Sequence, residues 1–343
     1  MRLLLSFILL LVIGGCTEVQ NHVALREELK VNAEGGYSDI IVIVEDRLWD
    51  KGLKSDVSFV FSEELKGLYS AEQNFDVVHV PPKGFSALFK SQRIIVEFDV
   101  SSSILQSGVG YKENKFAKGQ IYIKISAENF RIASQLLLES ATSLRKKVNS
   151  HRLGGLQDKI KELSSVDINA ALKGSVNVEM VLTKYFSTVV NEEGFAYFGK
   201  KAKGPCKSGH NSVCNYQLGL FVTKLGYDGP DVFEKKYFTA LRDSITKRYI
   251  IGPEKDKPTY MECERSVPLS AKVITLDGHY CVEFRGWWNM VNATMGGPFI
   301  SYLLVNEQTK VLYLIDGFLF APNFRKRDFL IELEAMIKTF KVI

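Results

Sequence analysis

The sequence is short of the features that mark several large classes of protein. Its 343 residues include 9 prolines and 26 glycines, a composition that excludes collagen-like, low-complexity and disordered chains. The 44 basic residues are nearly matched by 39 acidic ones, and a dedicated nucleic-acid binder would be more basic and more clustered. No Gly-x-Ser-x-Gly, His-Glu-x-x-His, phosphate-loop or Gly-x-Gly-x-x-Gly pattern occurs, so we predict no catalytic residues, no metal site and no cofactor.

Residues 1–15 have the features of a secretory signal peptide. Arg2 supplies a positive charge, and Leu3–Gly15 is an uncharged apolar run. At ~1.5 Å per helical residue this run is too short to span the ~30 Å core of a bilayer. It ends in two glycines followed by Cys16, which resembles the lipobox of bacterial lipoproteins. We therefore expect lipidation of Cys16; a plain signal peptide that contains a cysteine by chance is the alternative.

The residues after Cys16 bear on the location of the protein. Thr17 follows the cysteine in place of aspartate, which by resemblance to the sorting rules of Gram-negative bacteria favours the outer membrane. Residues 18–21 lack the acidic run that resembles a surface-export signal, so we expect a periplasm-facing protein, with the cell surface as the alternative. Residues 16–38 then form the lipidated cysteine and a polar tether. The expected partners are the membrane, through the lipid anchor, and an envelope protein or glycan; nucleic acid is not expected.

The remaining four cysteines agree with export, because oxidising compartments favour disulfides. The simplest pairing is local, and it joins Cys206 to Cys214 and Cys263 to Cys281. A metal site is the competing interpretation, since Cys206, His210 and Cys214 supply three soft ligands. Their spacing does not match the usual structural zinc patterns, so we favour the disulfides.

The pattern of apolar residues predicts an α+β protein with largely antiparallel sheets, helices packed on one face and two domains of similar size. We expect an N-terminal domain at 39–170 and a C-terminal domain at 171–343. Residues 39–45 and 93–100 are among the predicted strands. Two helical stripes have apolar residues three or four apart: Phe130, Ala133, Leu137, Ala141, Leu144 and Val148, and Phe329, Leu333, Met336 and Phe340.

Several helix ends are also predicted. Gly154-Gly155 is expected to interrupt the first long helix, and residues 176–190 are expected to be a strand. Asn323 is expected to cap the last helix. The basic residues 325–327 open that helix, where the helix dipole disfavours cations. Either an acidic partner offsets these positive charges, or the residues are simply exposed to solvent.

The side chains that most suggest binding are those of Arg285, Trp287, Trp288 and Asn289. Aromatic faces beside an arginine and an amide suit stacking on a sugar ring and hydrogen bonding to its hydroxyls. Because adjacent side chains of a strand face opposite ways, the simpler interpretation places one tryptophan in the core. We favour a non-enzymatic binding or scaffold module.

The alternative is an envelope glycan hydrolase or transferase that uses carboxylates near Trp287. Carboxylates such as Asp277, Glu283 and Asp316 are scattered along the sequence of this region. A pair of carboxyl groups ~5–10 Å apart in a deep cleft is the arrangement that such an enzyme requires.

Three short motifs are the most specific of the chain: VPP at 80–82 with Phe85, GGPF at 296–299, and GF at 317–318 followed by AP at 321–322. Through them, residues 35–343 resemble an uncharacterised family of Bacteroidota lipoproteins known only as a domain of unknown function. The sequence departs from the pattern at 150–185, where the family is more continuously helical. The resemblance implies a lipid-anchored envelope protein and supplies no activity, so no catalytic residues are carried over.

Overall fold

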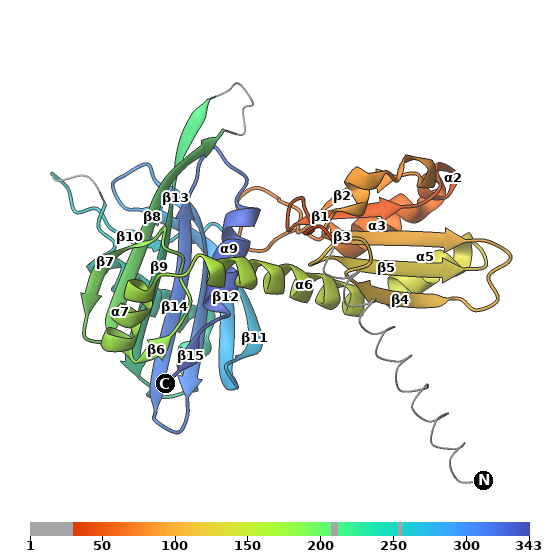
Figure 1. Cartoon of the computed structure of the whole chain (residues 1–343). Helices are drawn as coiled ribbons and strands as arrows, with labels where there is room; N and C mark the ends of the chain where they lie inside the picture. The colour runs from red at the N-terminus through yellow and green to blue at the C-terminus, as the bar shows by residue number, and fades with distance from the viewer. Residues whose placement is uncertain (1–29, 207–211, 253–255) are drawn as a thin grey trace, which may run out of the picture. The chain divides into compact units, whose positions relative to one another are not determined.

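The computed structural model describes residues 30–206, 212–252 and 256–343 (Figure 1). In this part of the chain there are two compact units, of which the first comprises residues 30–63 and 75–151 and the second residues 64–74 and 152–343. The predicted signal peptide, Cys16 and most of the tether lie outside the described residues. None of the helices in the described ranges is long and apolar enough to cross a membrane.

The first unit contains a five-stranded sheet in the order β2-β1-β3-β5-β4. Its strands are β1 (Asp39–Ile43), β2 (Asp76–Val80), β3 (Ile94–Val100), β4 (Gly108–Glu113) and β5 (Ile121–Ala127). Its helical segments are α2 (Asp46–Leu48), η1 (Trp49–Leu53), α3 (Lys54–Phe61), η2 (Pro82–Gly84), α4 (Ala87–Lys90), α5 (Phe130–Glu139) and the first half of α6 (Ala141–Glu162).

The α+β class with largely antiparallel sheets is confirmed for the sheets taken together, but the sheet of the first unit is mostly parallel. β1 pairs in parallel with β2 and β3, and β3 pairs in parallel with β5, so only β4 runs antiparallel to its neighbour. The reason lies in the connections: α2, η1 and α3 lead from β1 to β2, and η2 and α4 lead from β2 to β3. Such helical crossovers return the chain to the starting edge, so that the next strand runs in the same direction.

The apolar stripe predicted between residues 130 and 148 is confirmed as part of the core. Ala133, Leu137, Leu144 and Val148 are fully buried against the sheet. Two helices carry the stripe, because α5 ends at Glu139 and α6 starts at Ala141. The two glycines at 154–155 do not interrupt the second helix, which runs unbroken to Glu162.

The two compact units divide after His151, inside α6, whereas the sequence predicts a division between residues 170 and 171. The expected strand at 176–190 is also different, because α7 (Val166–Val176) is followed by the two-residue strand β6 (Val178–Glu179) and then by β7 (Ser187–Glu192).

The second unit is built on an eight-stranded sheet in the order β10-β12-β13-β14-β9-β8-β7, in which β11 also pairs with β12. All of these pairings are antiparallel, as predicted. Besides β7, the strands are β8 (Phe195–Pro205), β9 (Val213–Gly226), β10 (Met261–Cys263), β11 (Ser270–Leu276), β12 (His279–Met290), β13 (Gly296–Asn306) and β14 (Val311–Phe320). A short β15 (Lys341–Val342) pairs with β6.

Helices cover both faces of the eight-stranded sheet, not one as predicted. α7 and α9 (Arg327–Ile337) pack on one face, where Leu172 and Leu333 join the core. η3 (Pro230–Phe233) and α8 (Lys235–Tyr249) lie over the other face, where Phe238 and Ile245 join a separate core. Side chains of successive residues along β12 therefore enter two different cores.

Glycines in the sheet make room for aromatic rings on the α8 face. Phe299 lies over Gly286 on the neighbouring strand, where an added Cβ would come within 2.7 Å of the ring. Phe318 covers Gly219 in the same way, and a Cβ there would stand 2.1 Å from the ring. These cross-strand pairs let large rings lie flat against the backbone, so glycine is required at these strand positions.

A buried ion pair joins α8 to the sheet. Arg242 donates to Asp316 from Nε and Nη2, at 2.7 and 3.1 Å, and both side chains are fully buried. Ser301 donates to the same carboxylate, and the guanidinium lies 3.8 Å from the centre of the Phe299 ring. The charge of each partner is thus compensated by hydrogen bonds, which a buried charge requires.

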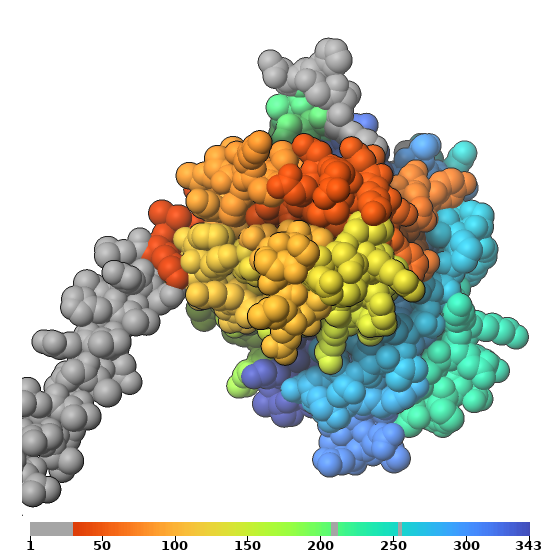
Figure 2. Space-filling model, turned by 90° about the vertical axis from the view of Figure 1, so that its right-hand side faces the viewer, coloured from red at the N-terminus to blue at the C-terminus, as the bar shows by residue number. Residues whose placement is uncertain are grey.

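The segment 64–74 belongs to the second unit although it follows α3 in the sequence. Gly67 has a φ of +78°, and its Cβ position lies 2.7 Å from the backbone of Arg285 and Gly286, so only glycine allows this close approach. The Glu72 carboxylate accepts hydrogen bonds from the backbone N–H groups of Lys326 and Arg327 at the start of α9. In the space-filling view, orange atoms at the right edge accordingly lie against blue atoms of the C-terminal half (Figure 2).

We predict that breaking the buried pair destabilises the second unit strongly. Asp316→Leu leaves the Arg242 charge buried without its partner, and such a change costs about 3–5 kcal/mol of unfolding free energy. The double variant Arg242→Met/Asp316→Leu removes both charges, so it should lose less stability than the single variant. Urea unfolding followed by circular dichroism measures both.

The control is Arg248→Met on the same helix. Arg248 forms a mostly exposed ion pair with Glu192 at 3.6 Å, so its replacement should change the unfolding free energy by no more than about 0.5 kcal/mol. Equal losses in Asp316→Leu and Arg248→Met would contradict the assignment.

Candidate ligand-binding site beside strand β12

The four residues predicted to bind a ligand are divided between the two faces of β12. Trp288 is 1% exposed, and its indole N–H donates to the Leu319 carbonyl at 3.2 Å. The indole crosses β13 at Gly297, where a Cβ would lie 3.3 Å from the ring nitrogen. Trp288 is therefore part of the core on the α8 face and is not available to a ligand. Arg285, Trp287 and Asn289 point to the α9 face.

Arg285 is committed to ion pairs. Its Nε donates to Glu283 at 2.6 Å and its Nη2 to Glu334 of α9 at 2.7 Å. Burial raises the pKa of Glu283, but the Arg285 charge and the hydrogen bonds from Arg285 and Tyr302 outweigh it and hold the pKa below its ordinary value. Glu283 is thus an ionised structural partner, and Arg285 attaches α9 to the sheet.

Trp287 remains as the candidate contact residue. Its indole lies beside strand β13 at Gly296, where a Cβ would come within 3.1 Å of the ring nitrogen. Tyr69, which is 69% exposed, approaches it edge to face with 5.8 Å between ring centres. Two residues farther along β12, Asn289 Oδ1 is buried and has no hydrogen-bond partner in the described part of the chain. The two aromatic rings come from segments more than two hundred residues apart.

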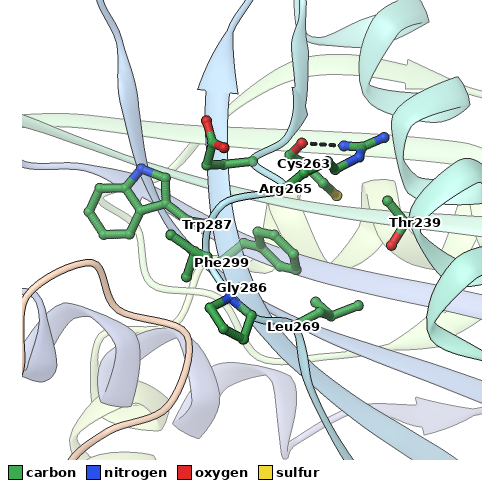
Figure 3. A pocket seen from close by; sticks show the side chains of 10 residues that line it. Thr239, Cys263, Arg265, Leu269, Gly286, Trp287 and Phe299 are labelled. Atoms are coloured by element: carbon green, nitrogen blue, oxygen red, sulfur yellow. Dashed lines mark hydrogen bonds between the residues drawn. The ribbon is translucent and has the colours of Figure 1, made fainter.

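A small pocket of about 260 Å³ opens where the edge of β12 is interrupted. β10 pairs with Met290, Asn289 and Trp288, and β11 pairs with residues 279–285. In the described ranges, no strand pairs with Gly286 and Trp287 on this edge. The connecting residues 264–269 bulge away and form the rim of the pocket. Figure 3 shows Thr239 of α8 on one side of the pocket and Trp287 on the opposite side, with Phe299 between them.

The ionisable groups of this pocket are not tuned for acid–base chemistry. Burial raises the pKa of the Cys263 thiol to about 12, although the Arg242 charge opposes the shift. The Ser266 backbone N–H donates to Glu264 and lowers the pKa of that exposed carboxyl. Arg265 donates to Asp243 and to the Cys263 carbonyl. A general acid or base works best with a pKa near the operating pH, which none of these shifts produces.

The carboxylates predicted for a hydrolase do not gather around Trp287. Glu283 faces α9, whereas Asp316 lies with Arg242 on the opposite face of the sheet. Asp277 lies in the turn between β11 and β12 and accepts from the Val342 N–H at 2.9 Å. Among the described residues there is also no group of three or more His, Cys, Asp or Glu side chains that could hold a metal ion.

One of the two expected disulfides is present. Cys206 and Cys214 are bonded to each other, which confirms the local pairing and excludes their use as zinc ligands; His210 lies outside the described residues. The pairing of Cys263 with Cys281 is wrong, because both are free and buried. Cys263 pairs in register with Trp288, which lies seven residues after Cys281 on β12. At about 3.3 Å per strand residue, Trp288 and Cys281 are more than ~20 Å apart, so Cys263 is far from Cys281. The two thiols also face different cores.

Two family descriptions match the chain. The Domain of unknown function (DUF8532) matches residues 33–161, and the Domain of unknown function (DUF4837) matches residues 165–339, which is just over half of the chain. The chain belongs to the DUF4837 family. The DUF4837 region holds β12 and the whole pocket, whereas Tyr69 comes from the DUF8532 region. The expectation of a family of unknown function is confirmed at this level.

No curated protein matches the chain. A Bacteroides thetaiotaomicron crystal structure is 8% identical over 48% of this chain and 45% of that chain, with a TM-score of 0.25. The chain thus spans less than half the length of the Bacteroides thetaiotaomicron protein. The Saccharomyces cerevisiae Ran-binding protein Mog1p is 10% identical over 48% of this chain and 89% of that one, with a TM-score of 0.29. TM-scores this low carry no argument about fold or function.

The thiols provide a direct test of the cysteine assignments. Burial raises the pKa of Cys263 and of Cys281 to about 12, so at neutral pH neither is a thiolate. We predict that maleimide leaves both thiols unmodified in the folded protein and modifies both after denaturation without reductant. Peptide mass mapping reads the result, and Cys206 and Cys214 should remain linked in one disulfide-bonded peptide. A linked Cys263–Cys281 peptide would refute the assignment.

Proposed function

We propose that the protein is a lipid-anchored binding module of the cell envelope that holds a glycan at Trp287 and performs no catalysis. The observation that carries this proposal is the aromatic pair of Trp287 and Tyr69 beside a shallow pocket with a polar rim. Flat aromatic faces suit the apolar faces of sugar rings, and Glu264, Arg265 and Thr239 offer hydrogen-bonding groups for hydroxyls.

The proposed location rests on the N-terminal sequence. A basic start, a short apolar run and small residues before Cys16 favour export and lipidation, and the resemblance to Bacteroidota lipoproteins agrees with them. Thr17 after the cysteine favours the outer membrane with the body facing the periplasm; the cell surface is the alternative. The Cys206–Cys214 disulfide is consistent with an oxidising compartment.

Binding is favoured over catalysis by the state of the carboxylates. A glycoside hydrolase needs two carboxyl groups on either side of the scissile bond, one of them protonated. Here Glu283 and Asp316 are each held by an arginine and lie on opposite faces of the sheet. The pocket is also smaller than the ~300 Å³ at which ligand sites usually begin, which suits a single ring of a longer glycan.

Removal of the Trp287 ring should weaken glycan binding. We predict that Trp287→Ala lowers co-sedimentation with purified peptidoglycan sacculi or with lipopolysaccharide at least about tenfold, because the main stacking surface is lost. Tyr280→Ala is the matched control, since Tyr280 lies on the same strand and is 44% exposed but does not line the pocket. Equal binding by the two variants, or no binding of either polymer by the unaltered protein, would contradict the proposed site.

The lipid anchor is tested independently. We predict that the wild-type protein incorporates radiolabelled palmitate, whereas Cys16→Ser does not, because the thiol that accepts the acyl chains is absent. A Cys263→Ser variant should behave as the wild type does. Absence of the label from the wild-type protein, or equal labelling of Cys16→Ser, would contradict lipidation of Cys16.

A further inference from the structure

A second and larger pocket lies at the other end of the sheet, between the end of β9 and the start of α8. Its volume is about 650 Å³, within the ~300–1,000 Å³ range of ligand sites. It shares no residue with the pocket beside Trp287. Nothing in the proposed function uses it.

The walls of this pocket are apolar. Leu225 and Leu312 come from the ends of neighbouring strands, Val232 from η3 and Leu241 from α8. Tyr237, one turn earlier on α8, is 48% exposed and also lines the pocket. Burial of these aliphatic side chains against another apolar group removes them from water, which is energetically favourable.

The rim of the pocket is acidic. Asp228 and Asp231 both line it, and neither forms an ion pair within the described ranges of the chain. The lysines at 235–236, in the first turn of α8, are exposed and do not line the pocket. Two uncompensated carboxylates stand out in a chain whose formal net charge is +5. An occupant that combines aliphatic groups with a positive charge complements this arrangement.

The shape of the rim favours an extended chain over a compact ligand. No atom lies within 4 Å of the Cβ positions of Gly226 and Gly229, so the rim is open at both glycines. Gly229 has a φ of +155°, a conformation that other residues rarely adopt, and the turn from β9 to η3 depends on it. A groove with bare backbone at its edge lets a peptide main chain approach closely.

We propose that this pocket binds a segment of a partner protein in which a lysine or arginine stands beside aliphatic residues. The aliphatic side chain enters between Leu225 and Leu241, and the cation lies between Asp228 and Asp231. The site is independent of glycan binding at Trp287, so either can fail without the other.

The test is selection of a random nonapeptide library displayed on phage against the full-length protein in nanodiscs. Sequences with lysine or arginine next to leucine, isoleucine, valine or methionine should be enriched. Their synthetic peptides should bind at least about tenfold more weakly to Asp228→Asn/Asp231→Asn, and their affinity should fall as salt is added, because charge attraction is screened. Asp167→Asn, an exposed acidic residue at the start of α7, is the control and should bind as the wild type does.

Three results would overturn the proposal: enrichment of acidic or purely polar sequences, no enrichment above background, and enriched peptides that bind the double variant and the wild type equally. Titration with hexylamine tests the other occupant. Binding of the amine without peptide enrichment would assign the pocket to a small alkylamine and reject a protein partner. Because Trp287→Ala leaves this pocket intact, peptide binding by that variant separates this proposal from the glycan site.

Discussion

The ion pair of Arg242 and Asp316 determines how α8 packs on the eight-stranded sheet. Asp316 lies in a central strand and Arg242 in the middle of α8, so the pair fixes both the height and the rotation of the helix over that face. Phe299 lies beneath the guanidinium and needs the bare backbone of Gly286 to do so. Phe299 and Gly286 also line the pocket beside Trp287, so the same packing that satisfies the buried charge shapes the candidate site.

A second long-range contact explains a conflict in the sequence. Residues 325–327 place positive charge at the N-terminal end of α9, where the helix dipole disfavours it. The acidic partner is Glu72, whose carboxylate accepts the N–H groups of Lys326 and Arg327. The predicted cap at Asn323 is wrong, because α9 starts at Arg327 and Glu72 accepts the N–H groups at its start. Glu72 also supplies the negative charge that the dipole favours. No local pattern reveals it, because the two segments are about 250 residues apart in the sequence.

Local patterns were sufficient for several elements and failed wherever the outcome depended on a distant segment. The stripe from Ala133 to Val148 and the Cys206–Cys214 disulfide follow from spacing alone and are confirmed. The parallel order of the first sheet depends on which strands become neighbours, and apolar runs do not encode that. Cys263 and Cys281 are close in sequence, but β10 pairs near the far end of β12 and separates them. Tyr69 reaches Trp287 because Gly67 lets its segment lie against β12. No local sequence pattern indicates this contact, so Tyr69 could not be predicted as part of the candidate site.

The pocket beside Trp287 exists because one edge of β12 carries two short strands in place of one long strand. The Glu264 N–H still donates to the Trp287 carbonyl at 2.8 Å, and the chain then leaves the edge until Ser270. Pro268 has no N–H to offer a ladder, so a continuous strand here would lose a hydrogen bond. An edge broken in this way is also a poor template for pairing with another chain. The interruption therefore leaves Trp287 on the wall of the pocket, and it limits edge-to-edge association.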